Sequence, residues 1–508
     1  MERLSIEVPE RTKGGKAQRL LGDDSSSSTT HEGSALTASA ATLAAVVAFV
    51  GGCGVLAYMV AQGGAGGAGG AAPFAGPSQI ATRFGASPAT ELVVSWAADA
   101  RCAAASVAFG QSADALDRSV AAALFSYSAP AAFGSNASYA SPALFAATLS
   151  GLQVSRPVFY RVGADACGGW SATLSASTAP DAGVAGAAFA IIGDLGQTVN
   201  SSTTLASILA RSAAAPAPFA ATLLIGDLSY ANGEQALWDS YGELVSPLAS
   251  AMPLQTLVGN HEWTLDTINA STGQADFRAY IARMHGNGGQ DAHALYYSFE
   301  VGLVHFVMLQ GYCPEMHSTI TQPCLRSGGA QVKWLEADLA SVDRARTPFV
   351  VAAFHQPFVN SNLAHSYDTE GVPMQDAVED LLYINGVDLV FSGHVHAYER
   401  SCRCYQLNCV ADGVTYVTIG DGGNHEGLVD TWQWPQPQWS RFRMAMWGHG
   451  ELTAINSTAL HFRWLPNPDA RTSLFDEFYI TKGAAAGAAD TARALAEPGV
   501  TVTGGRRV

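Results

Sequence analysis

The sequence predicts an α/β domain preceded by an all-β domain and by one transmembrane helix. Three features lead to this prediction. A long stretch without charged residues lies near the N-terminus, short apolar runs with small and polar spacers follow it, and apolar runs that alternate with helical segments fill the rest. With 508 residues the chain is long enough for about two or three domains and a large hydrophobic core.

The composition is apolar and acidic. Hydrophobic residues make up 48% of the chain and charged residues 14%, and the formal net charge is −16. Because sites for nucleic acids usually present a basic face, we expect no nucleic-acid partner. Small anionic ligands are compatible with this charge, since a bound metal ion reverses the charge locally.

The N-terminal apolar stretch has the properties of a membrane anchor. Residues 33–82 contain no charged side chain, and residues 36–61 within them are long enough to cross a bilayer core of ~30 Å as a helix. A buried core helix is the alternative, but such helices seldom lack charges on both flanks. Basic residues before the stretch place residues 1–35 in the cytoplasm and the rest on the extracellular or luminal side. The polar leader is long for a cleavable signal peptide, so we expect an uncleaved signal-anchor, with a secreted protein as the alternative.

Two further features fit the far side of a membrane. Glycosylation can occur only there, and the chain has four acceptor motifs, at Asn136, Asn200, Asn269 and Asn456. Seven cysteines follow the anchor, and their spacing suggests bridges Cys102–Cys167, Cys313–Cys324 and one within residues 402–409, which leaves one cysteine spare. The cysteines of residues 402–409 could instead bind zinc, but no matching second cluster exists, so we favour a disulfide.

The chain after the anchor divides into four segments that differ in composition and hydrophobic pattern. Residues 62–77 are a flexible linker rich in Gly and Ala, and residues 483–508 are a loose tail low in bulky side chains. Residues 78–180 contain short β-like runs, which predict an antiparallel sandwich. Residues 186–482 alternate apolar runs with helical segments, which predict α/β architecture.

Five apolar runs of the α/β region end in polar side chains. The first run, FAIIGDLG, includes Asp194, and the second, TLLIGDLSY, contains Asp227 and Tyr230. The remaining polar residues are Asn260 and His261 in LQTLVGNHE, His355 in FVVAAFHQP, and His394 and His396 in DLVFSGHVH. Loops that leave the carboxyl ends of strands in such sheets gather at one crevice. Each side chain alone has an ordinary explanation, as a turn residue, a helix cap or a core histidine. The five runs together, in this order, indicate a metal site.

The order GDLG, GDLSY, GNHE, FHQP and GHVHAYER resembles the metallophosphoesterase superfamily. The tyrosine of the second motif narrows the resemblance to purple acid phosphatases of the large, plant-type form. Residues 416–427 and 434–452 resemble the later part of those enzymes, so the resemblance covers roughly residues 77–482. It implies a sandwich of mixed β-sheets flanked by helices, preceded by a domain like fibronectin type III. Plant-type members of the family are often homodimers, so the resemblance also makes a homodimer possible for this chain.

The resemblance implies a role for each candidate residue. Asp194, Tyr230 and His396 would hold Fe(III), Asn260, His355 and His394 would hold a divalent metal (Zn, Mn or Fe), Asp227 would bridge the two, and His261 would lie near the phosphate. Ten residues after His355 the family usually has two adjacent histidines, whereas this chain has Ala364 and His365. We expect His365 or His261 to protonate or stabilise the leaving group. His425 and His449 receive no role.

The chemistry of the donors agrees with that assignment. Tyrosine has a free pKa near about 10, so a tyrosinate at acidic or neutral pH needs a highly charged cation beside it. Two metals about 3.5–4 Å apart clamp phosphoryl oxygens and generate a hydroxide that attacks phosphorus directly. We therefore expect an acid phosphatase that hydrolyses small phosphate monoesters. One alternative is the same fold acting on phosphodiesters or phytate-like polyphosphates. Another is a catalytically silent surface recognition protein, although the sequence keeps every metal-ligating residue that the resemblance implies.

Overall fold

The computed structural model describes residues 76–132, 135–262, 277–285, 295–312, 325–365, 371–467 and 476–482. The cytoplasmic tail, the anchor at 36–61, nearly all of the linker and the C-terminal tail lie outside the described residues, as do Asn269, Cys313 and Cys324. Among the helices that are described, none is both long and apolar enough to cross a membrane.

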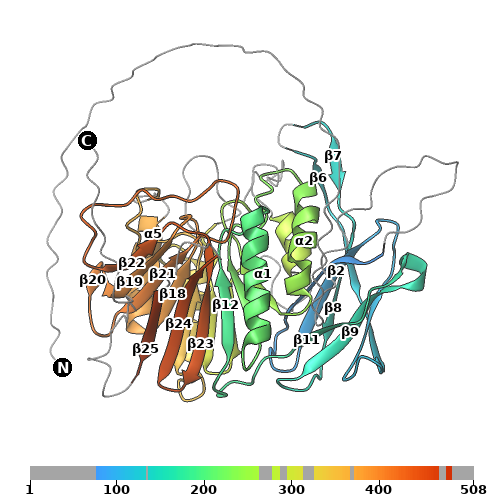
Figure 1. The fold of residues 1–508 in the computed structure, drawn as a ribbon, viewed down its shortest axis with the longest axis horizontal. Coiled ribbons are helices and arrows are strands. Elements are labelled where there is room, and N and C mark those ends of the chain that lie inside the picture. The colour runs from blue at the N-terminus through green and yellow to red at the C-terminus, as the bar shows by residue number, and fades with distance from the viewer. Residues whose placement is uncertain are drawn as a thin grey trace, which may run out of the picture. The chain divides into compact units, whose positions relative to one another are not determined.

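The N-terminal domain consists of two antiparallel sheets that share one hydrophobic core (Figure 1). The first sheet has the order β1 (Ser78–Phe84), β2 (Leu92–Ala98), β8 (Ala143–Leu149), β5 (Ala123–Phe125). The second has the order β10 (Gly169–Trp170), β9 (Pro157–Ala164), β3 (Ser106–Gly110), β4 (Arg118–Ala121), with β11 (Leu174–Ser177) beside β9. Trp96 of one sheet and Tyr160 of the other are fully buried, as alternation along half-buried strands requires. The predicted sandwich is confirmed; its likeness to fibronectin type III stays a prediction.

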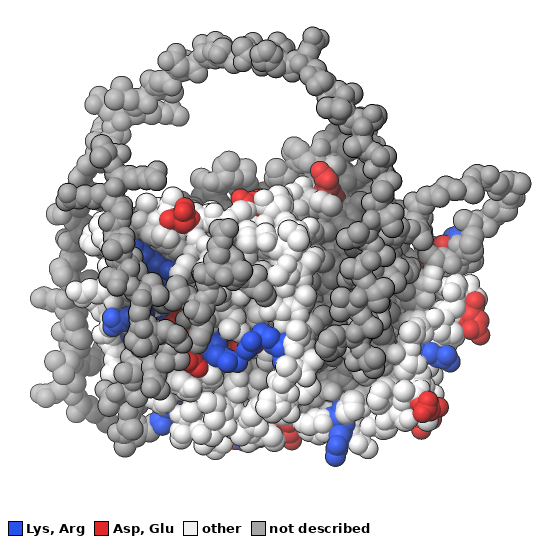
Figure 2. All heavy atoms as spheres, in the orientation of Figure 1, with Lys and Arg blue, Asp and Glu red and all other residues white. Residues whose placement is uncertain are grey.

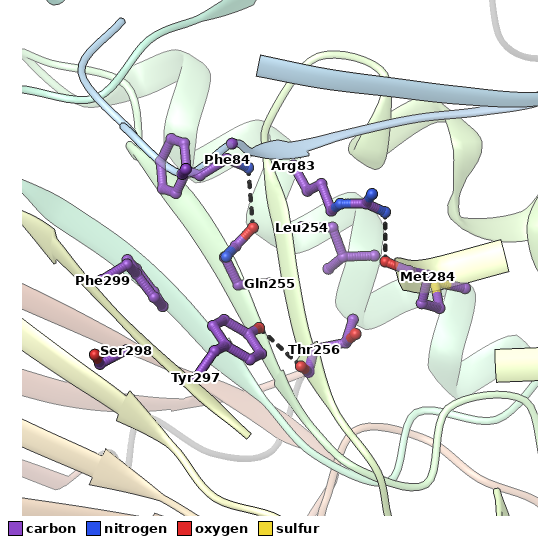
Figure 3. A pocket seen from close by; sticks show the side chains of 11 residues that line it. Arg83, Phe84, Leu254, Gln255, Thr256, Met284, Tyr297, Ser298 and Phe299 are labelled. Atoms are coloured by element: carbon purple, nitrogen blue, oxygen red, sulfur yellow. Dashed lines mark hydrogen bonds between the residues drawn. The ribbon is translucent and has the colours of Figure 1, made fainter. Parts of the chain in front are cut away.

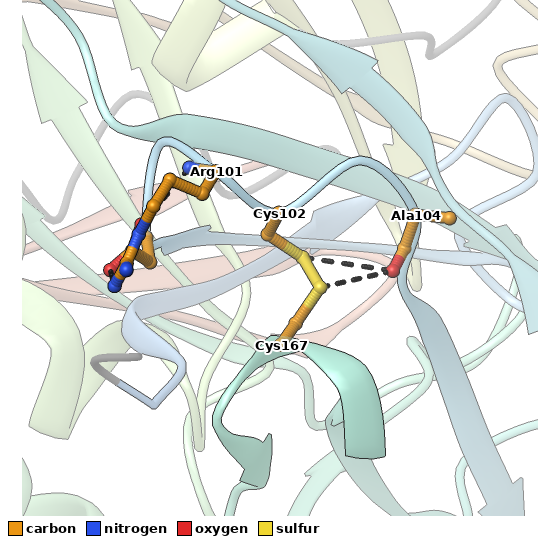
Figure 4. Close-up of a disulfide and its surroundings, with 5 residues drawn as sticks. Arg101, Cys102, Ala104 and Cys167 are labelled. Atoms are coloured by element: carbon orange, nitrogen blue, oxygen red, sulfur yellow. Dashed lines mark hydrogen bonds and ion pairs between the residues drawn. A yellow bond between two sulfur atoms is a disulfide. The ribbon is translucent and has the colours of Figure 1, made fainter. Parts of the chain in front are cut away.

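Two of the expected disulfides are present. Cys102, in the loop after β2, is bonded to Cys167 at the end of the 3-10 turn η1 (Asp165–Cys167), as Figure 4 shows. Cys402 is bonded to Cys409, which leaves Cys404 as a buried free thiol. Because two of these three sulfurs are bonded to each other, the zinc alternative is wrong for this segment.

The α/β domain that follows is built from two mixed sheets. The six-stranded sheet has the order β14 (Leu254–Leu257), β13 (Ala221–Ile225), β12 (Ala188–Ile192), β23 (Gly448–Asn456), β24 (Ala459–Pro466), β25 (Asp476–Thr481). The eight-stranded sheet has the order β15 (Tyr297–Val301), β16 (Val304–Met308), β17 (Phe349–Ala353), β18 (Leu389–Ser392), β21 (Val414–Ile419), β19 (Tyr398–Tyr405), β20 (Asn408–Cys409), with β22 (Ser440–Met444) beside β19. Strands β12, β13 and β14 are parallel to one another, as are β16, β17, β18 and β21.

Helices cover the outer faces of these sheets. Helices α1 (Val199–Ala214) and α2 (Ala236–Ala249) lie on the first sheet, and α4 (Ala330–Ser341) and α5 (Gly371–Ile384) belong to the core on the second. Along β12, Phe189 and Ile191 belong to the core between the sheets, whereas Ala190 and Ile192 belong to the core under α1 and α2. Strands covered on both faces read as continuous apolar runs, which explains the five-residue runs of the sequence.

The N-terminal domain packs on the α/β domain along β1, α2 and β14. The backbone N–H of Phe84 donates to Oε1 of Gln255 (3.0 Å), and the Tyr160 hydroxyl donates to the carbonyl of Ser250 at the end of α2 (2.6 Å). A cavity of about 60 Å³ lies in this seam. Arg83 is one of the side chains that line it (Figure 3). Burial lowers the pKa of Arg83 to about 10. Residues of both domains line the cavity, and the polar side chains of Gln255 and Tyr297 in its wall are hydrogen-bonded to protein groups.

Some of the charged residues join elements inside the α/β domain. Glu451 on β23 accepts from Arg463 on β24 (2.6 Å) and from Arg211 on α1 (2.9 Å), which joins the helix to the sheet. The two arginines outweigh burial and lower the pKa of Glu451. On the face drawn in Figure 2, charged side chains stand singly or in small groups on a mostly uncharged surface.

The pH dependence of stability should include a contribution from His449. This side chain is fully buried on β23, neither ring nitrogen has a hydrogen-bond partner among the described residues, and burial lowers its pKa to about 4. The unfolded chain takes up this proton below about pH 6.5 and the folded chain only below about pH 4, so stability is lost as pH falls through that window. We expect His449→Leu to recover on the order of 2–3 kcal/mol relative to the natural chain between pH 7.5 and 4.5, measured by urea unfolding at both pH values. An unchanged difference at the two pH values would contradict this expectation.

Candidate metal centre

The polar side chains predicted at strand ends lie together at the carboxyl edge of the sheets. They follow their strands by two to five residues: Asp194 after β12, Asp227 and Tyr230 after β13, Asn260 and His261 after β14, His355 after β17, and His394 and His396 after β18. Because the parallel strands of each sheet end at the same edge, segments as far apart in the sequence as Asp194 and His394, which are 200 residues apart, meet there.

Three of these side chains form a first donor group. The Tyr230 hydroxyl lies 3.2 Å from Oδ1 of Asp194 and 3.0 Å from Nε2 of His396. Nε2 of His396 lies 3.5 Å from the same Asp194 oxygen. The three side chains thus point one donor atom each at a common centre and are almost fully buried.

Four more form a second donor group beside the first. Oδ1 of Asn260 lies 2.9 Å from Nδ1 of His394 and 3.2 Å from Nε2 of His355, which in turn lies 3.0 Å from Oδ2 of Asp227. One ligand atom each of Asp227, His355 and His394 falls within 4.8 Å of the others. The groups adjoin, because His355 Nε2 is also 3.9 Å from Oδ1 of Asp194.

Backbone carbonyls orient two of the imidazoles. Nδ1 of His355 lies 2.8 Å from the carbonyl of Ile225, and Nδ1 of His396 lies 3.0 Å from the carbonyl of Gly427. A carbonyl only accepts, so each Nδ1 carries a proton, and each Nε2 faces the donor groups, where it could bind a cation. This arrangement is typical of metal-ligating histidines.

Glu262 fixes the loops that carry the donors. Its carboxylate accepts from the N–H groups of Asp227, Leu228 and Gly259, each at 2.8 Å. Burial, with the nearby Asp227 charge, raises the pKa of Glu262 to about 8. The sequence-based assignment missed this residue; its only signal was an acidic side chain next to the Asn260–His261 motif.

The donor loops adopt unusual backbone conformations. Asp194, Asp227, Tyr230 and His394 all have positive φ, between 51° and 68°. Such conformations cost roughly 1 kcal/mol or more for residues other than glycine and cluster at functional sites. The glycines beside them are needed for space, since a Cβ at Gly259 would lie 2.1 Å from Oδ1 of Asp227.

The protonation chemistry of the site fits bound cations. Burial and the Asp194 charge raise the pKa of Tyr230 well above its ordinary value, so the protein alone opposes a tyrosinate. Burial opposes a charge on His355 as well, yet the Asp227 and Asp194 carboxylates raise its pKa to about 10. Without cations the site collects protons on its donors; cations would displace those protons and satisfy the same carboxylates. The set of carboxylate, phenol, amide and imidazole donors suits a hard ion next to a borderline one.

Further polar side chains surround the donors. The His261 ring packs on Tyr230 with ring centroids 4.1 Å apart, its Nδ1 bonds to Oδ1 of Asn232, and its Nε2 lies 3.5 Å from Glu426. On the other side, the His365 ring lies 4.0 Å from that of His394. The sequence-based assignment placed His261 and His365 here but missed Asn232 and Glu426.

One histidine that received no role also belongs to this site. The ring of His425 meets the ring of Tyr230 edge-on, at 5.5 Å between centroids. The segment with His425 and Glu426 follows β21 and reaches the donors because Asn424 bonds to the Asp194 carbonyl (3.2 Å). His449, in contrast, lies within β23 and contacts no donor among the described residues.

The fold and the donor set together define a metallophosphoesterase. The model for calcineurin-like phosphoesterases matches residues 187–398, that for the purple acid phosphatase N-terminal domain matches 77–178, and that for iron/zinc purple acid phosphatase-like protein C matches 413–477. The chain is 40% identical to purple acid phosphatase 22 of Arabidopsis thaliana, over 65% of this chain and 70% of that protein. It is 31% identical to the phosphoenolpyruvate phosphatase of Allium cepa, over 78% of this chain and 80% of that protein.

The chain belongs to the purple acid phosphatase family and is a metal-dependent phosphatase. A solved relative in fold is the purple acid phosphatase PPD1 of yellow lupin, with TM-score 0.67, 22% identity, and coverage of 81% of this chain and 75% of that one. The resemblance drawn from the motifs is therefore confirmed, as is an iron centre with a divalent partner as the family's cofactor. The Fe(3+)-Zn(2+) purple acid phosphatase 12 of Arabidopsis thaliana is 33% identical, over 58% of this chain and 62% of that protein.

Proposed function

We propose that this chain hydrolyses phosphate monoesters at a binuclear centre in which the first donor group holds Fe(III) and the second holds a divalent ion. Asp194, Tyr230 and His396 would hold the ferric ion, Asn260, His355 and His394 would hold the divalent ion, and Asp227 would serve both. The observation that carries the proposal is that the two donor groups lie next to each other and that the first of them contains Tyr230, the only phenol in either group. Zinc, manganese and iron all suit the second.

The surrounding histidines supply the remaining chemistry. When bound, the two cations attract the phosphoryl oxygens and lower the pKa of a water molecule. Because Asn232 accepts from Nδ1 of His261, Nε2 of that ring is directed toward the substrate side, next to Asp227 (3.8 Å). His365 packs on His394 and is our candidate to protonate the departing alkoxide.

The metal and substrate assignments are tested together on the purified full chain in detergent. We expect a visible tyrosinate-to-iron charge-transfer band, one iron and one divalent ion per chain, and monoester turnover at least about a hundredfold above diester turnover. A colourless, iron-free protein with full activity would refute the ferric assignment. Faster turnover of phosphodiesters or of inositol hexakisphosphate would favour the alternative substrates instead.

The role of His365 is tested by substitutions at His365 and at the adjacent Ala364. We expect His365→Ala to lower kcat for an alkyl phosphate by about 10²-fold, because the alkoxide then leaves without a positioned acid. The loss should be smaller for 4-nitrophenyl phosphate, whose leaving group needs no proton. Ala364→His should restore part of the alkyl phosphate turnover in the double variant. His461→Ala, in a strand far along the sheet, is the matched control; equal losses for both substrates would count against an acid role.

We also propose that the catalytic part lies on the extracellular or luminal side of a membrane. Two disulfides support an oxidising compartment. The acceptor asparagines Asn136 and Asn456 are exposed and could carry glycans. A mass decrease after enzymatic deglycosylation of protein made in its host cell tests this placement, and an unglycosylated protein would count against it.

A further inference from the structure

The turn between Tyr230 and α2 carries active-site groups in a strained backbone. Tyr230, Asn232 and Gly233 have φ of 51°, 48° and 92°. Asn232 is exposed, yet its side chain holds the ring of His261. A backbone with several left-handed residues keeps one conformation only where surrounding structure fixes it. The contacts of this turn therefore bear on the geometry of the centre.

One set of contacts comes from the catalytic domain. Nε2 of Gln197 donates to the carbonyls of Ser229 (2.9 Å) and Leu237 (3.0 Å), on either side of the turn. Within the turn, the N–H of Glu234 donates to the carbonyl of Ala231 (2.7 Å). These bonds hold the two ends of the turn and close it on itself, and further bonds within residues 229–238 support it.

The other set comes from the N-terminal domain. Its strands β6 (Ser128–Pro130) and β7 (Ser138–Ala140) form a separate two-stranded hairpin that stands beside one end of α2 in Figure 1. The carbonyl of Ala131, next to β6, accepts from the N–H of Gln235 at the start of α2 (3.1 Å). The carbonyl of Ser128 accepts from the Arg278 guanidinium (2.8 Å).

A buried guanidinium joins the hairpin to α2. Arg283, in the π-helical turn Ile281–His285, donates to the Tyr139 hydroxyl (2.8 Å), to Oδ1 of Asp239 (2.7 Å) and to Oε1 of Gln79 (2.7 Å). Tyr139 also donates to Oδ2 of Asp239 in the first turn of α2 (2.9 Å). The hairpin is thus joined to the first turn of α2 by charge-assisted hydrogen bonds and to the end of the catalytic turn by the backbone bond of Gln235.

We propose that the β6–β7 hairpin of the N-terminal domain is a positioning element of the metal centre, which fixes the turn 231–235 and, through Asn232, the ring of His261. The N-terminal domain then contributes to turnover without touching substrate. Its kinetic consequence rests on the proposed phosphatase activity, whereas its structural consequence does not. A small displacement of a catalytic group is enough to change kcat, since productive geometry tolerates errors well below about 1 Å.

Two variants of the network and one matched control test the proposal. Arg283→Met removes the central guanidinium, and Tyr139→Phe removes a single hydroxyl and serves if the first variant does not fold. Tyr160→Phe is the control, because it also removes one interdomain hydroxyl bond from α2 but at the opposite end, at Ser250. Amide hydrogen exchange is measured on metal-free protein, and kcat and KM on metal-loaded protein.

We expect the amides of residues 231–235 to exchange about tenfold faster in Arg283→Met, with a smaller change in Tyr139→Phe and none in Tyr160→Phe. In the loaded enzyme kcat should fall about tenfold and about threefold in the two network variants, with KM within about twofold. Similar losses of thermal stability in all three variants, with exchange at 231–235 and kcat unchanged, would overturn the proposal and leave the network a purely structural seam. An inactive natural chain would refute the phosphatase proposal alone, since the exchange comparison would still stand.

Discussion

Asp227→Asn should lower kcat/KM for a phosphate monoester by a factor on the order of 10⁴. The Asp227 carboxylate is buried, lies 3.0 Å from Nε2 of His355 and 3.8 Å from Nε2 of His261, and accepts from the N–H of His261 at 2.8 Å. The amide keeps the volume and the hydrogen bond but removes the negative charge that the two donor groups share. Without this negative charge, less of the repulsion between two cations at the site would be offset, so the metal content should fall together with the activity.

Metal analysis and turnover of the same sample check this expectation. Asp338→Asn is the matched control, because that carboxylate pairs with His305 (3.0 Å) and Ser298 instead of the donor groups. A variant that keeps both metals and turns over within tenfold of the natural chain would contradict a shared Asp227. If the cellular role of the protein survives while phosphate release is lost, the recognition alternative gains support.

The parts of the site that the sequence predicted are those encoded by local pattern. An apolar run such as residues 221–225 is buried on both faces, and its polar end falls at the sheet edge by topology alone. Asp194 and His394 are 200 residues apart and follow strands of different sheets, yet the Asp194 carboxylate accepts from the His394 N–H (3.0 Å). Strand-end position was enough to predict their meeting.

The parts that could not be predicted depend on loops without such a register. His425 reaches Tyr230 because the segment after β21 turns back over the site, and no spacing in the sequence encodes that turn. Glu262 was unpredictable for another reason, since a buried carboxylate that binds three N–H groups has the same letter as a solvated surface acid. The hairpin of β6 and β7 is likewise too short to stand out among the sandwich strands.

Tyr230→Phe should abolish the visible charge-transfer band and leave the fold intact. The hydroxyl lies 3.2 Å from Asp194 and 3.0 Å from His396, and it is the only phenol in either donor group. Burial raises its pKa well above the ordinary value, so only a bound cation of high charge can keep it as tyrosinate. Removing one of three anionic donors should also make Fe(III) easier to reduce and lower kcat by about 10–100-fold, since a charged ligand is lost but Asp194, Asp227 and His396 remain.

Tyr241→Phe separates this effect from the loss of any buried phenol. Tyr241 is fully buried in the same domain, and its hydroxyl has no hydrogen-bond partner among the described residues. The control should therefore keep colour, iron and turnover, while Tyr230→Phe keeps iron under oxidising conditions and loses colour. If the visible band persists in Tyr230→Phe, another ligand produces it, and the assignment of the first donor group to Fe(III) through a phenolate is wrong. If Tyr230→Phe loses iron and colour together while zinc stays, the result still assigns the ferric ion of the natural chain to the first donor group. The phenolate then supplies much of the affinity for iron, because a hard trivalent cation gains more from an anionic oxygen than a divalent one does.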